Sequence, residues 1–210
     1  MTKDINDGKV SLQKDDLILQ GDFSALKRRL KPNNLNGEML VKAARLKHFE
    51  GTPTLLDATA GMGEDALLLA AAGFYVLLYE YNPQIAQALS DTIRRAADDP
   101  DLSEIIQRME VHNADSIQEM PKLSGKVDVV YLDPMFPKRK KSGRIKKKFQ
   151  VLQDLELPCA DEEGLLEAAF LAHPKKIVIK RPVKAEPLAG RKPDYSLKGS
   201  VIRYDCFVPG

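Results

Sequence analysis

The sequence predicts a doubly wound α/β domain with a mostly parallel sheet and an antiparallel hairpin at its C-terminus. Three observations predict this fold. Short apolar runs alternate with helix-forming segments, four of these runs end in an acid, and two last strand-like runs lie on either side of Lys198-Gly199. Strands that alternate with helices form βαβ units, in which the strands are parallel and the crossovers are right-handed.

The first half of the chain supplies three helices and two strands of this pattern. Apolar residues recur at helical spacing over residues 38–49, before a Gly-Thr-Pro stop. Residues 54–58 form a short apolar strand that leads into a glycine-rich turn, and residues 65–72 are rich in helix formers. Residues 74–80 are apolar on both faces, as expected for a strand that helices cover on both sides. Residues 84–97 repeat an apolar stripe and therefore predict a helix.

The second half of the chain completes the sheet. Residues 109–115 form a weak strand and residues 127–133 a clear one. A helix rich in Leu and Ala is expected over residues 162–172, followed by a strand over residues 176–180. Residues 194–207 differ from the rest, because two strand-like runs around a Lys-Gly turn indicate a hairpin that closes the sheet.

Length and composition indicate one soluble domain. The 210 residues suffice for a two-sided core, with 43% hydrophobic and 30% charged residues and a net charge of +2. We expect a short N-terminal extension with a basic segment at residues 1–36 and the α/β domain at residues 37–210. No apolar run approaches the roughly 18 residues of a membrane span, and the polar start is no secretory signal, so a cytoplasmic protein is expected. Cys159 and Cys206 are far apart, and no Cys/His cluster predicts a metal.

Four acids follow predicted strands. They are Asp57, Glu80, Asp115 and Asp133. Ligands bind at the carboxyl ends of the strands in an open α/β sheet, so these acids are expected to surround one crevice. The sequence therefore predicts a cofactor site at this edge.

The turn Asp57-Ala58-Thr59-Ala60-Gly61-Met62-Gly63-Glu64-Asp65 is the expected cofactor loop. Gly61 and Gly63 have no Cβ, which lets the backbone approach a ligand. Glu64 and Asp65 would repel a diphosphate, whereas they suit the cationic methionine portion of S-adenosylmethionine. Glu80 is placed to bind both hydroxyls of an adenosine ribose. The alternative is a tight turn such as any α/β domain contains, with Glu80 as a solvated strand end.

The segment Asp133-Pro134-Met135-Phe136-Pro137 is the second distinctive feature. It resembles the Asp/Asn-Pro-Pro-Tyr/Phe loop of methyltransferases that act on exocyclic nitrogen. The Asp133 carboxylate and the Pro134 carbonyl would accept the two hydrogens of a conjugated amine, and Phe136 would stack on the extruded base. The alternative is a proline-rich turn with Phe136 in the core.

A strongly basic run follows this loop directly. We expect its cations to hold phosphates of a nucleic acid; they are Lys138, Arg139, Lys140, Lys141, Arg144, Lys146, Lys147 and Lys148. A solvated loop is the alternative. Lys180 and Arg181 end a strand beside the same crevice, where they would contact the nucleotide backbone or, equally, pair with an acid.

Together, the Asp57–Asp65 loop, Tyr131-Leu132-Asp133-Pro134-Met135-Phe136-Pro137 and Val178-Ile179-Lys180-Arg181-Pro182 resemble the ribosomal RNA small subunit methyltransferase J family. The resemblance runs from about Leu17 to the C-terminus. It implies a bacterial enzyme with the Rossmann-like class I methyltransferase fold that makes N2-methylguanosine in the 16S rRNA of the small ribosomal subunit.

The resemblance also implies the contacts to S-adenosylmethionine. They fall on Glu64, Asp65, Glu80, Tyr81, Asp115, Ser116 and Asp133. The stretch from Pro32 to Gly37 departs from the family, because a more glycine-rich segment is usual there, and an N-terminal extension of familiar members is lacking. A methyltransferase for another exocyclic amine, such as adenine N6 in RNA or DNA, and a non-catalytic RNA-binding ribosome assembly factor remain alternatives. The sequence predicts no oligomeric state.

Overall fold

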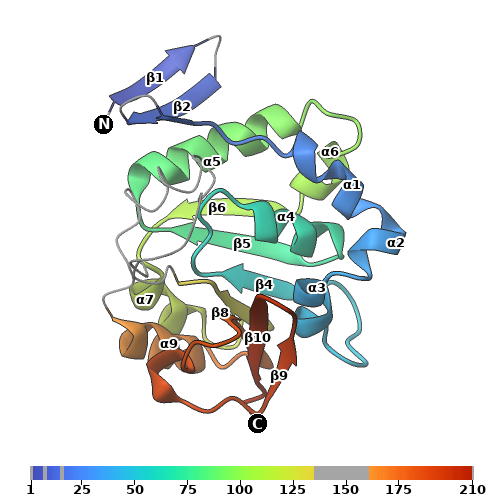
Figure 1. Cartoon of the computed structure of the whole chain (residues 1–210), viewed down its shortest axis with the longest axis vertical. Coiled ribbons are helices and arrows are strands. Elements are labelled where there is room, and N and C mark those ends of the chain that lie inside the picture. Colours follow the sequence, from blue (N-terminus) through green and yellow to red (C-terminus); the bar gives the residue numbers. More distant parts are fainter. Residues whose placement is uncertain (1, 7–8, 15–16, 135–160, 210) are drawn as a thin grey trace.

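Seven strands form one sheet at the centre of the molecule (Figure 1). The computed structural model describes residues 2–6, 9–14, 17–134 and 161–209. The strand order is β6-β5-β4-β7-β8-β10-β9, in which β4 to β8 are parallel and β10 runs antiparallel to both of its neighbours. The strand bounds are β4 Thr54–Asp57, β5 Tyr75–Glu80, β6 Met109–Asn113, β7 Val129–Leu132, β8 Lys176–Pro182, β9 Tyr195–Lys198 and β10 Ile202–Phe207.

The order of the strands reverses beside β4. The chain first builds outward through β5 and β6, then returns to place β7 and β8 on the other side of β4. The loops that follow β4 and β7 therefore lead away in opposite directions at the carboxyl ends of these strands, which is where open α/β sheets bind ligands. The predicted doubly wound sheet and its C-terminal antiparallel hairpin are confirmed.

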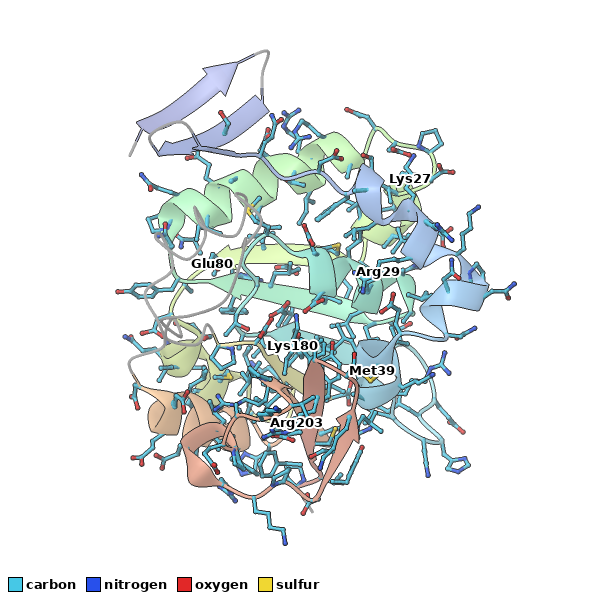
Figure 2. The ribbon with its side chains drawn as sticks, in the orientation of Figure 1. Lys27, Arg29, Met39, Glu80, Lys180 and Arg203 are labelled. Carbon is cyan, nitrogen blue, oxygen red and sulfur yellow. The ribbon has the colours of Figure 1, made fainter. Side chains whose placement is uncertain are left out.

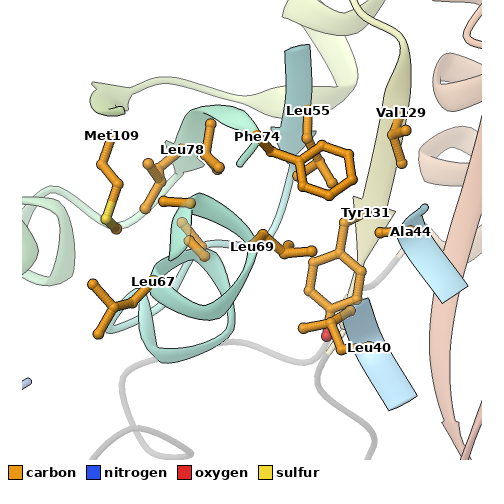
Figure 3. Close-up of a cluster of buried hydrophobic side chains, with 14 of the residues drawn as sticks. Leu40, Ala44, Leu55, Leu67, Leu69, Phe74, Leu78, Met109, Val129 and Tyr131 are labelled. Carbon is orange, nitrogen blue, oxygen red and sulfur yellow. The ribbon is translucent and has the colours of Figure 1, made fainter. Parts of the chain in front are cut away.

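Helices cover both faces of the sheet because successive strand residues point to opposite sides. Leu55, Val129 and Tyr131 belong to one buried cluster, whereas Leu56 and Val130 belong to another. Figure 3 shows the first cluster, in which Leu40 and Leu69 lie beside Tyr131 and Leu67 lies on the side towards Met109. The helices of this face are α3 Met39–Ala44, α4 Glu64–Ala71, α5 Pro83–Ala96 and α6 Ser103–Ile106; those of the other face are α7 Ser116–Glu119, the 3-10 helix η2 Met120–Leu123 and α9 Glu162–Leu171.

The first helix of the domain is shorter than its apolar spacing predicts. It was expected over residues 38–49, but α3 ends at Ala44, and Arg45 has extended backbone. The Lys176 ammonium donates to the backbone carbonyls of Ala43 and Arg45. This buried lysine satisfies carbonyls at the helix end, so the chain turns there.

The N-terminal residues form structure that the sequence did not reveal. A separate antiparallel sheet contains β1 Thr2–Asn6, β2 Lys9–Lys14 and β3 Leu17–Leu19, and it lies alongside α5 (Figure 1). The Val10 backbone amide donates to Asp91 Oδ2 of α5 at 3.1 Å. The 3-10 helix η1 Ser24–Leu26 and the helices α1 Lys27–Leu30 and α2 Pro32–Leu35 then lead to α3. In the ranges that the structure describes, no helix is long and apolar enough to cross a membrane.

The segment between β3 and η1 packs onto the loop that follows β4. A Cβ at Gly21 would lie 2.8 Å from Met62 Cε, and one at Gly63 would lie 3.5 Å from Phe23 Cζ. Arg95 of α5 donates to the Gly21 carbonyl at 2.7 Å. Residues from the N-terminal extension therefore help to hold this loop in place. The 3-10 helix η3 Leu188–Gly190 follows β8.

Candidate active site

The predicted acids lie at the carboxyl edge of the sheet, at different depths. Asp57 is level with Leu78 in β5 and Tyr131 in β7. Glu80 and Asp133 therefore lie two residues further along their strands, towards the crevice. Asp57 is 1% exposed, whereas about a third of the Asp133 side chain is accessible. The expected gathering at one edge is confirmed, while the role of each acid stays a prediction.

Two glycines shape the loop between β4 and α4. Gly61 has φ 52° and Gly63 has φ 74°, in the left-handed region that favours glycine. Gly63 is the residue that precedes α4, so the loop turns sharply into the helix that carries Glu64 and Asp65. A Cβ at Gly63 would also lie 2.6 Å from Leu89 Cδ1. The local backbone therefore requires glycine at this position.

Glu80 connects this loop to the end of β5. Its Oε2 accepts the Gly61 backbone amide at 2.9 Å, and its Oε1 accepts the Asn82 amide at 2.8 Å. Burial raises the pKa of Glu80, and the two backbone hydrogen bonds partly offset that effect. Each carboxylate oxygen retains a second lone pair, so the hydroxyls of a ribose fit this acceptor. Figure 2 shows Glu80 to the left of Lys180.

Asp57 lies beneath the loop and supports it. One carboxylate oxygen accepts the Thr59 backbone amide at 3.1 Å. Burial, together with the nearby charges of Asp65 and Asp133, raises the pKa of Asp57 well above its usual range. Asp57 therefore fits a role in holding the loop better than a role as its exposed wall.

Lys180 joins two acids from different elements at the centre of the site. Its Nζ lies 2.7 Å from Asp65 Oδ2 and 2.8 Å from Asp133 Oδ2. Burial alone would lower the pKa of Lys180, but the charges of Asp133 and Asp65 outweigh it and raise that pKa. Burial raises the pKa of Asp133, and Lys180 opposes the rise. The ammonium therefore favours the charged form of a carboxylate that burial would otherwise neutralise.

Two further contacts fix this group, and the sequence analysis missed both. The Tyr131 hydroxyl donates to Asp65 Oδ2 at 2.7 Å, and the Asp133 backbone amide donates to Thr59 Oγ1 at 2.7 Å. Tyr131 precedes Asp133 by two residues, so strand alternation places both side chains on one face. That alternation was the available signal for Tyr131. Nothing in the sequence indicated that Thr59 would reach across to the next strand.

Lys180 and Arg181 both form ion pairs with acids, which supports the second of the two expectations for them. Their contact to a nucleotide backbone stays a prediction. Arg181 is 5% exposed, donates to the Glu186 carbonyl at 2.7 and 3.0 Å, and approaches Glu162 at 3.3 Å. These internal partners hold the Arg181 guanidinium against the segment that follows β8.

The remaining predicted contacts form the rim near β5, β6 and β7. Asp115 caps α7, with Oδ1 accepting the Ile117 amide at 3.0 Å, and Ser116 is buried in the first turn of that helix. Tyr81 is 73% exposed at the end of β5, and Pro134, the residue after Asp133, is buried. Phe136 and the basic run from Lys138 to Lys148 lie outside the described residues.

The C-terminal hairpin holds the segment that follows Lys180. Arg203 pairs with Asp205 at 2.8 Å, and both side chains are buried. The Arg203 guanidinium also donates to the carbonyls of Pro182, Val183 and Ala185 at 2.7 to 3.0 Å. Arg203 therefore fixes the backbone just beyond β8, and Figure 2 shows it below Lys180.

The arrangement fits S-adenosylmethionine. A tight glycine loop can approach the ligand, a carboxylate at the end of β5 can accept ribose hydroxyls, and acids from α4 and β7 can face a cationic sulfonium. Among the residues that the structure describes, no group of three or more His, Cys, Asp or Glu side chains is arranged to hold a metal ion. This fold and site define a class I methyltransferase.

Comparison with known proteins agrees with that class. A family model described as a SAM-dependent methyltransferase matches residues 5–209. A ribosomal RNA small subunit methyltransferase J from Hahella chejuensis is 40% identical over 184 residues, which cover 88% of this chain and 69% of the relative. The protein of that name from Shewanella sp. strain ANA-3 is 38% identical over 195 residues, 92% of this chain and 74% of the relative. The chain belongs to the ribosomal RNA small subunit methyltransferase J family.

Solved structures support the same fold. The crystal structure of a SAM-dependent methyltransferase from Neisseria gonorrhoeae is similar to this chain, with a TM-score of 0.76 and 33% identity over 96% of this chain and 79% of the other. An rRNA methyltransferase from Streptomyces viridochromogenes has a TM-score of 0.55 at 17% identity, with 85% of each chain covered, and shares the fold alone. The chain is therefore a methyltransferase, and its cofactor is S-adenosylmethionine.

Proposed function

We propose that this enzyme transfers a methyl group from S-adenosylmethionine to the exocyclic N2 of a guanosine in 16S rRNA of the small ribosomal subunit. One observation carries the chemistry. Asp133, followed by Pro134, lies at the carboxyl end of β7, where Lys180 and Thr59 fix it beside the cofactor loop. The relatives' activity on small-subunit ribosomal RNA, as their names state it, supports small-subunit rRNA as the substrate.

Asp133 and Pro134 prepare the amine for attack. The lone pair of an amine conjugated to a purine ring is delocalised, so the nitrogen is a weak nucleophile. Asp133 accepts one amine hydrogen, because an ionised carboxylate has lone pairs beyond the one that faces Lys180. The Pro134 carbonyl accepts the other hydrogen, which favours a pyramidal nitrogen.

The bound cofactor supplies an electrophilic methyl group on a sulfonium. Glu80 and the glycine loop orient the adenosine, so that most of the acceleration comes from proximity and orientation. We assign no dedicated base, since the proton can leave after the methyl group has arrived. Phe136, outside the described residues, stacks on the extruded base in this proposal.

The basic run that follows the catalytic loop holds the RNA in this proposal, and these cations also lie outside the described residues. They are Lys138, Arg139, Lys140, Lys141, Arg144, Lys146, Lys147 and Lys148. We infer that residues 37–210 carry the methyl-transfer chemistry, with residues 1–36 as an N-terminal extension. We place the enzyme in the cytoplasm, where ribosomal RNA is found.

A transfer assay tests the target. The enzyme is incubated with tritiated S-adenosylmethionine and with 16S rRNA, small subunits or DNA, and the labelled nucleoside is identified. N2-methylguanosine is expected. N6-methyladenosine would instead support the adenine alternative, and binding of the cofactor without transfer to any substrate would support a non-catalytic assembly factor.

Asp133→Ala tests the role of the carboxylate. We expect transfer to fall by at least about a hundredfold, comparable to the loss of one transition-state hydrogen-bonding group. Asp98→Ala is the matched control, because Asp98 is an exposed acid outside the site and outside residues 27–42. Near wild-type transfer by the Asp133 variant, with cofactor binding retained, would contradict the role that we propose for Asp133.

A further inference from the structure

The surface formed by α1, α2 and α3 is strongly basic. Between residues 27 and 42, Glu38 is the only acid, and the cations are Lys27, Arg28, Arg29, Lys31 and Lys42. We call these residues the α1–α3 face. Only two of these five cations form ion pairs with described residues. Lys27 pairs with Asp99 and Asp101 at 2.7 and 2.9 Å, and Arg29 pairs with Glu38.

The other cations of this face have no such partner. Across the described parts of the chain, no carboxylate oxygen lies within 4.0 Å of Arg28, Lys31 or Lys42, and all three residues are exposed. The backbone of this segment is held by a hydrogen bond from the Asn34 side chain to the Arg28 carbonyl at 2.7 Å, which connects α2 to α1. The fold therefore fixes the backbone and leaves the cationic ends to solvent.

A hollow of about 560 Å³ lies in the same face. Its lining includes Arg28, Arg29, Asn33, Glu38 and Met39. The hollow is shallow and open to solvent, so it suits one face of a larger ligand better than an enclosed small molecule. The lining offers cations, amide groups and an apolar thioether, which suits a charged ligand that has a flat apolar part.

The guanidinium plane of Arg29 has a fixed orientation in this hollow. Its Nε lies 2.7 Å from Glu38 Oε1 and its Nη2 lies 2.9 Å from Oε2, a bidentate pair that fixes the plane of the guanidinium. The side chain remains 44% exposed. A fixed and accessible guanidinium plane is a platform on which unpaired bases of RNA commonly stack.

The α1–α3 face adjoins the active site. Helices α1 and α3 contact α4, whose first turn carries Asp65, and Asp65 Oδ2 lies 2.7 Å from Lys180 Nζ. Hydrogen bonding to Glu38 raises the pKa of Arg29, and the charge of Asp65 contributes to that rise. In Figure 2, Glu80, Lys180 and Arg29 follow one another from left to right. A polynucleotide with one nucleotide at Asp133 would therefore extend onto this face.

We propose that the α1–α3 face binds the RNA strand that flanks the target nucleotide, with phosphates at Arg28 and Lys31 and an unpaired base stacked on Arg29. This proposal rests on RNA as the substrate. The α1–α3 face would then be a second surface for RNA, beside the active site.

Two double variants of the full chain test the two kinds of contact. In Arg28→Ala/Lys31→Ala, two phosphate contacts are lost. The slope of log Kd against log salt for a small-subunit rRNA fragment should therefore decrease by about 1.5, from about 0.7–0.9 for each contact. Arg29→Ala/Glu38→Ala leaves the net charge unchanged, so lost stacking should weaken binding by about tenfold without changing the slope.

Lys126→Ala/Lys192→Ala is the matched control, because both lysines are exposed and lie outside this face. Fluorescence anisotropy gives Kd, and cofactor binding with thermal unfolding verifies the fold of each variant. Unchanged RNA binding by both test variants, or an equal change in the control, would overturn the proposal. A wild-type enzyme that neither binds nor methylates rRNA would instead refute the proposed function. If the wild type acts on rRNA and the variants match it, only the docking surface is refuted.

Discussion

Replacing Lys180 tests how the site keeps Asp133 charged. In Lys180→Met the ammonium that lies 2.8 Å from Asp133 and 2.7 Å from Asp65 is lost, and two carboxylates remain close together. Lys180 lowers the pKa of Asp133, whereas Asp65 raises it. Both consequences of the substitution therefore raise the pKa of Asp133. The ionised form of Asp133 accepts the amine hydrogen. On acidification, the Lys180→Met enzyme should therefore lose activity at a higher pH than the wild type does.

The size of the shift can be bounded from the geometry. Two unit charges 2.8 Å apart interact by about 1.5 kcal/mol even at the dielectric constant of water, about 80. At about 1.36 kcal/mol per pKa unit, this is about one unit. The partly buried site screens less than water does, and opposite charges at this range shift a pKa by about 1 to 3 units. We expect the acid limb of the pH profile to move upward by about 1 to 2 pH units.

The assay is transfer of tritium from S-adenosylmethionine to rRNA, measured as kcat/KM between acidic and neutral pH. Lys180→Arg is the control, because it keeps the positive charge and should leave the acid limb close to that of the wild type. Circular dichroism and cofactor titration establish that each variant is folded. An acid limb that does not move in a folded Lys180→Met enzyme would refute the electrostatic role of this lysine.

Two substitutions probe the cofactor loop. The pKa of Asp57 is raised in the folded state, so its stabilising contribution is complete at low pH and is lost as the pH rises through the folded value. Asp57→Asn should therefore increase Tm more at pH 8 than at pH 5 without cofactor, and equal changes would contradict this reasoning. Gly63→Ala should destabilise by at least about 1–2 kcal/mol, because it combines positive φ with a 2.6 Å approach to Leu89. Gly51 also has positive φ, but a Cβ there would meet no atom within 4 Å. Gly51→Ala should therefore lose less unfolding free energy in urea than Gly63→Ala. Equal losses would exclude the contact with Leu89 as a cause.

The parallel sheet was predictable because its strands are buried on both faces. Residues 74–79 and 129–132 are continuous apolar runs, each followed by an acid, and a strand that helices cover on both sides requires this pattern. The N-terminal sheet was not predicted. Its strands are short. Residues 2–6 contain a single apolar residue, and the alternation in residues 9–14 is limited to Val10 and Leu12, which is too brief a pattern to predict a sheet.

The candidate site was predictable in position but not in detail. Strand ends located Asp57, Glu80 and Asp133, because parallel strands share one carboxyl edge. Local sequence does not determine that Lys180 pairs with Asp65 as well as Asp133, since these residues come from three separate elements. Arg181 shows the same limit. Lys180, the preceding residue, faces the acids of the site. Successive side chains of a strand point to opposite faces of the sheet, so Arg181 points towards Glu162 on the other face.

The contact of Phe23 with the cofactor loop affects where the stable domain of this enzyme begins. Composition suggests a boundary at residue 36, yet Phe23 is 3% exposed and lies against Gly63 from the other side of that boundary. A chain cut at residue 36 would lose a buried aromatic ring above the loop, and emptying such a site typically costs about 3–5 kcal/mol. It would also lose the Gly21 carbonyl to which Arg95 donates. The smallest part of this chain able to hold the loop in shape therefore begins before Gly21, and the boundary in sequence is not a boundary in stability.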